Sequence, residues 1–301
     1  MLDVRPLRYF VTVARTLHFG RAAQQLHVSQ PPLSRQIAAL EREVGARLFE
    51  RNAHKVRLTP AGEQMLADAQ AILERLERIP ANIAAIASGA GGTLRIGFTM
   101  CAAYSVIPGI ARRFGSAYPK VSLQLREVVP NDLPSQLMEG RIDVAVMFPI
   151  ERIPGIEQRR IFSEPFCAAL PATHPLAGRR AFRLADLADS PFIAAPAEVS
   201  PNLRLAIEAE CAAAGFAPRV HMEVQLQQTI LSLVAEGVGV ALVPASMMKM
   251  RVEGVKFRRL TGGQDIDQVL AWAAANQNPC LRNLLERERG ATASVPTPAP
   301  R

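Results

Sequence analysis

Apolar residues between positions 33 and 44 recur with the period of an α-helix. The repeat consists of Leu33, Ile37, Leu40 and Val44. One face of this helix is therefore expected to be buried, while the opposite face stays polar. Ser29 is a candidate N-cap, and the two prolines that follow Gln30 fall within the first turn, where a missing N–H costs little. With a shorter helix before it, the stretch 19–43 predicts a helix-turn-helix.

The flanking patterns decide between this motif and an ordinary pair of amphipathic helices. An apolar stripe at positions 7–14 predicts a preceding helix. After Gly45, two short extended runs flank a polar, basic turn in LFERNAHKVRLT, which is typical of a β-wing. We therefore expect a mainly α-helical winged helix-turn-helix domain over residues 1–58.

A long helical pattern follows over residues 59–88. Thr59 and Pro60 form a start signal, a cap followed by proline at the first helical position. Apolar residues then alternate at three and four positions, as in a coiled-coil seam. The seam consists of Met65, Ala69, Ile72, Leu76, Ile79, Ile83 and Ile86. We expect a linker helix that pairs two subunits, with packing on its own domain as the alternative, and a kink or lost hydrogen bond at Pro80.

Glycines at 89–92 predict a flexible hinge, after which strands and helices alternate. The order βαβαβ predicts a parallel sheet with helices on its faces. A second α/β set and a late strand and helix predict a hinged, two-lobed α/β receptor domain. The expected segments are lobe I over 93–161 with 266–290, lobe II over 162–265, and a disordered tail over 291–301.

Charge is concentrated in the first sixty residues. They hold ten basic and four acidic residues, so six of the eight net positive charges of the 301-residue chain lie there. This asymmetry favours a polyanionic partner, such as double-stranded DNA, for the N-terminal segment. No apolar run reaches the length of a membrane span and no leader pattern opens the chain, so we expect a cytoplasmic protein without a membrane partner.

The sequence contains no pattern typical of catalysis or metal binding. The four cysteines are scattered, at positions 101, 167, 211 and 280, without metal-ligand spacing, which favours packing roles over a disulfide, zinc or redox role. No nucleophile elbow or P-loop occurs, and we predict no catalytic residue, metal or cofactor. An enzyme or a solute-binding protein built on the two-lobed half remains the alternative.

Candidate ligand-binding residues follow the predicted strands. In α/β sheets ligands bind beyond the carboxyl ends of strands, near helix N-termini whose free N–H groups favour anions. The candidates are Thr99, Met100, Cys101, Pro130, Asn131, Phe148, Ser200, Pro201, Asn202 and Gln225.

The order of these parts resembles the LysR-type transcriptional regulators over about residues 2–290. The matching motifs are LRYF (7–10), RAAQQLHVSQPPLSRQIAALEREVGARLFER (21–51), LTPAGE (58–63), LRIGF (94–98), EGRIDVAV (139–146), HPLA (174–177) and EGVGVALVPAS (236–246). The resemblance implies a DNA-binding regulator, homodimeric or homotetrameric, that acts with RNA polymerase. It also implies that the C-terminal half is a two-lobed, periplasmic-binding-protein-like effector domain that senses a small inducer. A constitutive regulator without inducer is the alternative.

The resemblance also implies DNA-contacting residues at the recognition helix and wing. They are Ser29, Gln30, Pro31, Ser34, Arg35, Arg51, His54 and Lys55. Gln30 and Arg35 can offer bidentate hydrogen bonds to base edges, while the wing is expected to contact phosphate or the minor groove.

Two motifs are similar to the subgroup that senses intermediates of aromatic breakdown. These are QPPLSRQ and the SPN of residues 200–202. The chain departs from that subgroup at Pro130, where it tends to have Thr or Ser, and at Phe148, where it tends to have Arg. Losing that arginine removes a partner for a carboxylate. Among aromatic and organic-acid inducers, a weakly charged or aromatic one is therefore favoured over a small dicarboxylate.

Overall fold

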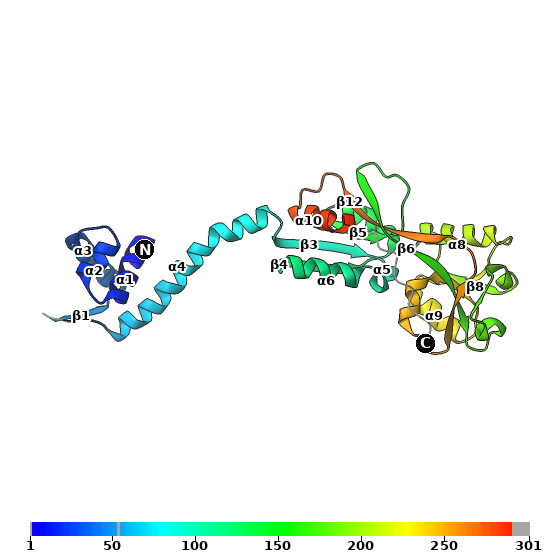
Figure 1. Ribbon diagram of the computed structural model, residues 1–301, viewed down its shortest axis with the longest axis horizontal. Helices are drawn as coiled ribbons and strands as arrows, with labels where there is room; N and C mark the ends of the chain where they lie inside the picture. Colours follow the sequence, from blue (N-terminus) through cyan, green and yellow to red (C-terminus); the bar gives the residue numbers. More distant parts are fainter. Residues whose placement is uncertain (1, 53–54, 291–301) are drawn as a thin grey trace. The chain divides into compact units, whose positions relative to one another are not determined.

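The computed structural model describes residues 2–52 and 55–290. The chain divides near residue 84 into two compact units (Figure 1), which are described separately. Among the described residues no helix is long and apolar enough to cross a membrane.

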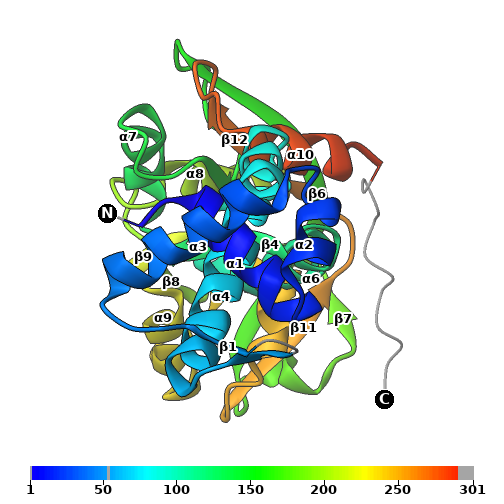
Figure 2. The ribbon, with the colours of Figure 1, turned by 90° about the vertical axis from the view of Figure 1, so that its left-hand side faces the viewer.

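The N-terminal unit is a winged helix-turn-helix, which confirms the predicted fold. Its helices are α1 (Val4–Thr16), α2 (Phe19–Gln25) and α3 (Gln30–Val44), and its wing strands are β1 (Phe49–Asn52) and β2 (Lys55–Leu58). The wing is an antiparallel pair in which Phe49 opposes Leu58. Figure 2 shows α1, α2 and α3 grouped above β1.

Small buried residues and two hydrogen bonds to one carboxylate hold this unit together. Ala22 and Ala23 of α2 are buried against the apolar stripe of α3, which allows the two helices to pack closely. The Glu41 carboxylate on α3 accepts the backbone N–H groups of Leu48 and Phe49 at 2.9 and 3.1 Å. These bonds fix the start of the wing relative to α3.

Helix α4 (Pro60–Ala87) begins at the predicted signal. The Thr59 hydroxyl accepts the Gly62 N–H at 2.9 Å and donates to the Arg47 carbonyl at 2.7 Å. Gly62 is required there, because a Cβ at this position would lie 2.1 Å from the Leu48 carbonyl oxygen. The helix continues through Pro80, so the residues around this proline stay helical despite its missing N–H.

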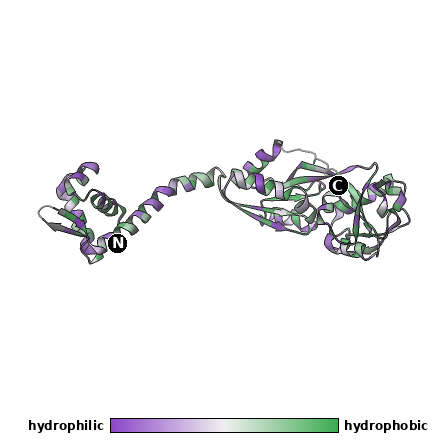
Figure 3. Ribbon diagram, turned by 60° about the horizontal axis from the view of Figure 1, so that its bottom comes forward, coloured by the Kyte–Doolittle hydropathy of each residue, from purple (hydrophilic) through white to green (hydrophobic). Residues whose placement is uncertain are grey.

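The predicted seam of α4 divides into two parts. Ala69 is fully buried in the core of the N-terminal unit, and Met65 packs against the same core. These two residues were expected in an intersubunit seam, and the structure instead assigns them to their own domain. The periodicity of a helix shows that a face is covered but not which neighbour covers it. Ile79 and Ile83 further along are exposed, and the last turns of α4 are largely hydrophobic (Figure 3).

The C-terminal unit contains an eight-stranded mixed sheet and a two-stranded sheet. Seven strands of the large sheet follow the order β4-β3-β5-β12-β6-β11-β7, and β10 also pairs with β6. The strands are β3 (Gly91–Phe98), β4 (Lys120–Glu127), β5 (Val144–Met147), β6 (Ile156–Pro171), β7 (Ala181–Phe182), β10 (Ala241–Pro244), β11 (Val255–Leu260) and β12 (Asp265–Ala273). The small parallel sheet pairs β8 (Pro191–Ala194) with β9 (Arg219–Glu223).

Helices cover both faces of the lobe I sheet. The helices of this unit are α5 (Met100–Tyr104), α6 (Ile107–Ala117), α7 (Leu133–Met138), α8 (Pro201–Ala213), α9 (Gln227–Ala235) and α10 (Pro279–Arg287), with short 3-10 turns that include η1 (Pro130–Asp132) and η4 (Ala245–Met250). Helices α6 and α10 pack on one face through Phe114 and Leu284. Helix α7 packs on the other face through Leu133.

The parallel sheet expected from the βαβαβ order is present in β4-β3-β5, but β12 is antiparallel to both neighbours. The long strand β6 serves both lobes, because its first part pairs with β12 and its last part with β10 and β11. Phe162 of β6 therefore packs in the lobe I core and Ile266 of β12 in the lobe II core, the reverse of the predicted boundary. A continuous strand carries no sequence break at a lobe boundary.

The glycine-rich segment at 89–92 differs from the predicted flexible hinge. Gly91 and Gly92 belong to β3 and pair with Lys120 and Val121. Gly89 is buried, with a φ of 72°, and its missing Cβ leaves room for the Pro279 carbonyl, 2.5 Å from where a Cβ would lie. These glycines permit close backbone packing and a left-handed turn.

Candidate functional site

The N-terminus of α3 presents a polar face above a buried one. Gln30, Pro31 and Arg35 are exposed and Ser34 is half-buried, whereas Leu33 and its periodic partners are buried. The residues expected to read DNA thus lie together on the outer side of one helix. Long polar side chains on such a face are suited to hydrogen bonding with base edges.

Ser29 occupies the N-cap position of α3, with extended backbone, but its side chain forms no capping hydrogen bond. The residue is exposed, so its hydroxyl is accessible to a binding partner. The start of α2 lies against Gln30, because a Cβ on Gly20 would be 3.6 Å from the Gln30 Oε1. Gly20 therefore lies beside Gln30, at a distance where even a Cβ would make only ordinary van der Waals contact.

Two of the three predicted wing residues belong to the wing strands. Arg51 belongs to β1 and Lys55 to β2. His54 lies outside the described residues, as do the side-chain positions of Arg51 and Lys55. Their expected contacts with DNA stay predictions.

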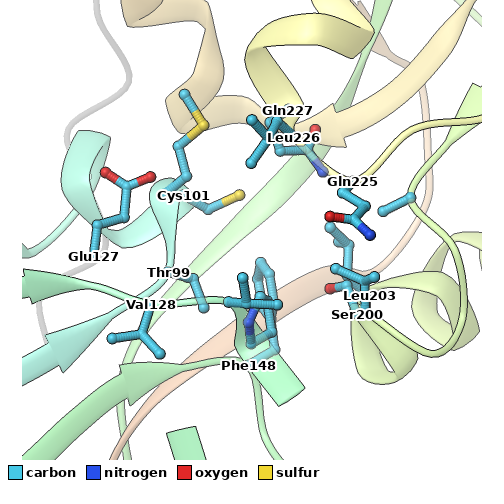
Figure 4. A pocket seen from close by; sticks show the side chains of 15 residues that line it. Thr99, Cys101, Glu127, Val128, Phe148, Ser200, Leu203, Gln225, Leu226 and Gln227 are labelled. Carbon is cyan, nitrogen blue, oxygen red and sulfur yellow. The ribbon is translucent and has the colours of Figure 1, made fainter. Parts of the chain in front are cut away.

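A cleft of about 250 Å³ opens in the C-terminal unit at the ends of its strands (Figure 4). Its lining includes seven of the predicted ligand-binding residues, which are Thr99, Met100, Cys101, Pro130, Phe148, Ser200 and Gln225. An adjoining groove of about 390 Å³ is lined by Asn131, Pro201 and Asn202. Pro130, Phe148 and Ser200 line both spaces. The structure therefore brings all ten predicted residues to one region.

Backbone topology explains this convergence. Strands β3, β4 and β5 are parallel, so their carboxyl ends meet at one edge of the lobe I sheet. Helices α8 and α9 begin at Pro201 and Gln227, and their first residues reach the same cleft from lobe II. Neither N-cap side chain, Ser200 nor Leu226, forms a capping hydrogen bond, which leaves N–H groups of the first turns for a ligand.

Sequence reasoning missed several cleft residues next to those it found. They are Glu127, Val128, Val129, Ala195, Val199, Leu203, Leu226 and Gln227. Each lies at a strand end or in a helix first turn, so extending the same rule by two or three positions would have included them. Glu127 is the most consequential, because it is a carboxylate at the rim of a largely apolar cavity.

A buried polar cluster behind the cleft was not predicted. The Glu164 carboxylate on β6 accepts the Ser246 N–H at 2.5 Å, the Ser246 hydroxyl at 3.0 Å and the Gln268 Nε2 at 2.9 Å. Burial raises the pKa of Glu164, although the bonds from Ser246 and Gln268 oppose that rise. Sequence gives no signal for this cluster, because its members lie on separate elements.

This cluster connects the two lobes. The Ser105 hydroxyl, just after α5, donates to the Gln268 Oε1 at 3.0 Å. Lys249 of η4 donates its Nζ to the Tyr104 carbonyl at 2.6 Å. Helix α5 starts at the cleft with Met100 and ends at these bonds, so it joins the cleft to the crossing strands.

The four cysteines are free and buried. Burial raises the pKa of the Cys101 thiol to about 12 and that of Cys211 to about 11, and the pKa values of Cys167 and Cys280 are raised for the same reason. A thiol is reactive as thiolate, so these side chains are suited to packing rather than nucleophilic or redox chemistry. Within the described part of the chain, no group of three His, Cys, Asp or Glu residues could hold a metal ion.

Comparisons with known proteins agree with this arrangement. The family described as "Bacterial regulatory helix-turn-helix protein, lysR family" matches residues 4–63, and "LysR substrate binding domain" matches residues 87–291. The regulator AlsR of Bacillus subtilis is 34% identical over 285 residues, covering 94% of each chain. IlvR of Caulobacter vibrioides is 36% identical, covering 94% of this chain and 96% of its own. Full-length CbnR complexed with its target DNA superposes with a TM-score of 0.80 at 29% identity, covering 97% of this chain and 100% of that one.

Proposed function

The chain belongs to the LysR family of bacterial transcriptional regulators, and on that premise we propose which of its residues bind DNA and which bind the inducer. It is a DNA-binding regulator with an effector-binding domain and not an enzyme. Gln30 and Arg35 read base edges in the major groove, while Ser29, Ser34 and the wing residues contact the backbone. Residues 1–58 form the DNA-binding domain in this proposal.

The exposed polar face of α3 supports this assignment. Gln30, Pro31 and Arg35 lie on the outer side of a helix whose inner side is buried in the domain core. The wing adds Arg51 and Lys55 on two paired strands. Basic and amide side chains in this arrangement are suited to phosphate and base contacts, whereas the wing position favours phosphate.

The cleft of the C-terminal unit binds the inducer. The single observation that carries this proposal is that lobe I and lobe II line one cavity through strand ends and helix starts, with Thr99 and Phe148 on one side and Ser200 and Gln225 on the other. A ligand that contacts both sides stabilises a closed arrangement of the lobes. It acts as a switch only if it binds two states of the regulator with different affinity. Phe148 offers an aromatic inducer a ring contact.

Dimerisation through α4 spaces the recognition helices. One helix reads only a few base pairs, so useful specificity needs copies at helical-turn intervals. Ile72, Ile79, Ile83 and Ile86 are exposed in the single chain, and their burial would drive pairing of two α4 helices. The regulator in this proposal is a homodimer or a homotetramer built from such pairs. The regulator works in the cytoplasm, where operator DNA and RNA polymerase are present.

A gel-shift experiment with the gene's own upstream region tests this function. We expect specific binding at moderate salt that competitor DNA of unrelated sequence does not remove, and a changed footprint when an inducer is added. Absence of sequence-specific binding contradicts the proposal. A thermal-shift screen against a metabolite panel separates an inducer-responsive protein from a constitutive regulator.

A further inference from the structure

We infer that the ligand of the cleft has no net negative charge and donates hydrogen bonds to Glu127 and Gln227. This inference rests on the proposal that the cleft holds the inducer, and it specifies the chemistry of that molecule. It restricts the aromatic or organic-acid class expected from sequence to neutral, zwitterionic or cationic members.

The charge of the cavity wall is the first argument. Glu127 is the one charged side chain among the described residues that line the cleft, and no lysine, arginine or histidine is among them. The adjoining groove likewise has Glu151 and no cation among its described lining residues. A ligand carboxylate would therefore lose water beside a like charge, with only the partial positive charges of the helix starts and no cationic side chain to offset that cost.

Cations near the cleft are already paired elsewhere. The Arg204 Nε donates to Glu208 at 2.6 Å, and its Nη1 donates to the Ala195 carbonyl and to Glu223, both at 3.0 Å. The Lys249 Nζ donates to the Tyr104 carbonyl. Neither Arg204 nor Lys249 lines the cavity.

An unpaired acceptor is the second argument. The Gln227 Oε1 is buried and has no hydrogen-bond partner. A buried acceptor without a donor costs free energy that a ligand N–H or O–H would recover. Glu127 ends β4 in lobe I and Gln227 begins α9 in lobe II, with Cys101 between them in Figure 4. A ligand that donates to both therefore joins the two lobes.

The remaining wall defines the body of the ligand. Its apolar side chains are Met100, Val128, Val199, Leu203, Leu226 and the ring of Phe148. They favour a small aromatic or branched alkyl group. The free N–H groups at the starts of α8 and α9 favour a carbonyl or hydroxyl oxygen, or the carboxylate of a zwitterion whose ammonium group faces Glu127.

Two matched series of compounds test the inference on the full-length protein. The first series comprises benzoate, benzamide, benzyl alcohol and benzylamine. The second comprises the branched alkyl counterparts 3-methylbutanoate, 3-methylbutanamide, 3-methylbutanol and 3-methylbutylamine. Calorimetric titration should give tighter binding of at least one amide, alcohol or amine than of the carboxylate with the same skeleton, by tenfold or more. Tighter binding of the carboxylates, or no binding by any donor-bearing member, overturns the inference.

Variants test whether Glu127 and Gln227 cause the preference for donor-bearing compounds. Glu127→Gln should weaken amine binding by about tenfold or more, the loss expected for a charge-assisted hydrogen bond, and should change alcohol binding by less than about threefold. Gln227→Leu should weaken every donor-bearing member. Glu157→Gln, at an exposed position of β6 that lines neither space, is the matched control and should leave the affinities unchanged. Equal effects of Glu127→Gln and Glu157→Gln overturn the assignment to Glu127.

Operator binding by the same preparation is measured by gel shift without any compound. Loss of specific DNA binding contradicts the proposed function. A preference for carboxylates with DNA binding intact contradicts only the ligand chemistry.

Discussion

In the proposed function, individual side chains at the start of α3 determine how this regulator reads DNA. Gln30 and Arg35 are exposed five positions apart, on a helix whose other face is held by Leu33 and Ile37. Their function depends on reach and hydrogen-bonding geometry rather than on stabilising the fold. Replacing them is therefore expected to change recognition without changing the free energy of unfolding.

We expect Arg35→Ala to weaken specific operator binding by about 1–3 kcal/mol, the contribution of one bidentate base contact. Competition gel shifts against unrelated DNA measure the ratio of specific to non-specific affinity. Arg42→Ala removes the same charge from the last turn of the same helix and is the control. An unchanged specificity ratio for Arg35→Ala would exclude Arg35 from base readout.

Glu164 makes stability depend on pH. Burial raises its pKa in the folded protein above the ordinary value of 4.5, so the folded state holds this proton more tightly than the unfolded chain does. The contribution of Glu164 to the free energy of unfolding should therefore fall as pH rises from about 4.5 through the raised pKa, and then stay constant. Denaturant titrations between pH 4 and 8, at roughly unit intervals, should show this component vanish in Glu164→Gln.

Glu157→Gln, at an exposed position of the same strand, is the control for Glu164. It should leave the pH profile of unfolding unchanged. Identical profiles for Glu164→Gln and the unaltered protein would show that the Glu164 proton does not contribute.

At the scale of elements, α4 changes role along its length. Its first turns complete the N-terminal core through Ala69, which is fully buried, whereas Ile83 is 61% exposed. In our proposal the same heptad pattern therefore serves packing within a domain and then pairing between subunits. The Asn283 Nδ2 donates to the Ser88 carbonyl at 3.0 Å and so holds the C-terminal end of α4.

Ile83→Asp and Ala69→Asp should separate these two roles. Ile83→Asp should weaken dimerisation by at least about tenfold, because each subunit loses the burial of one large apolar side chain. Ala69→Asp should instead lower the free energy of unfolding by more than about 2 kcal/mol, because it places a carboxylate in an apolar core. Sedimentation and denaturant titration measure the two quantities. A stable dimer of Ile83→Asp would contradict a seam at this position.

Gly89→Ala tests whether the start of the effector domain is rigid. Gly89 and Gly140 have φ values of 72° and 67°, so alanine introduces similar backbone strain at both. A Cβ at residue 89 would also lie 2.5 Å from the Pro279 carbonyl, whereas nothing lies within 4 Å at residue 140. Gly89→Ala should destabilise the protein by about 1–3 kcal/mol more than Gly140→Ala, measured by denaturant unfolding. Equal losses would favour a flexible hinge.

At the scale of the whole molecule, the regulator couples two binding events. An inducer changes operator affinity only through its differential affinity for the regulator's states. Linkage requires that operator DNA change inducer affinity by the same factor. We expect titrations of inducer with and without operator to give a ratio equal to the ratio of operator affinities with and without inducer. Unequal ratios would show that a further component, such as a change of oligomeric state, enters the cycle.

Local patterns determined much of this protein. The stripe of α3, the start of α4 at Thr59 and Pro60, and the strand ends around Thr99 and Phe148 follow from periods and cap residues that act within a few positions. The comparisons confirm the family that the motifs indicated. Short-range chemistry suffices for these features, because hydrogen bonding and side-chain spacing within one element do not depend on distant neighbours.

Only tertiary structure decided the rest. It determined that Ala69 faces its own domain, that Gly91 joins a sheet, that β12 runs antiparallel to its neighbours, and that Glu164 meets Ser246 and Gln268. Each of these depends on contacts between residues far apart in the chain. A sequence pattern fixes which face of an element is apolar or which residue is charged, but the partner that covers or neutralises it is chosen by the packing of the whole chain.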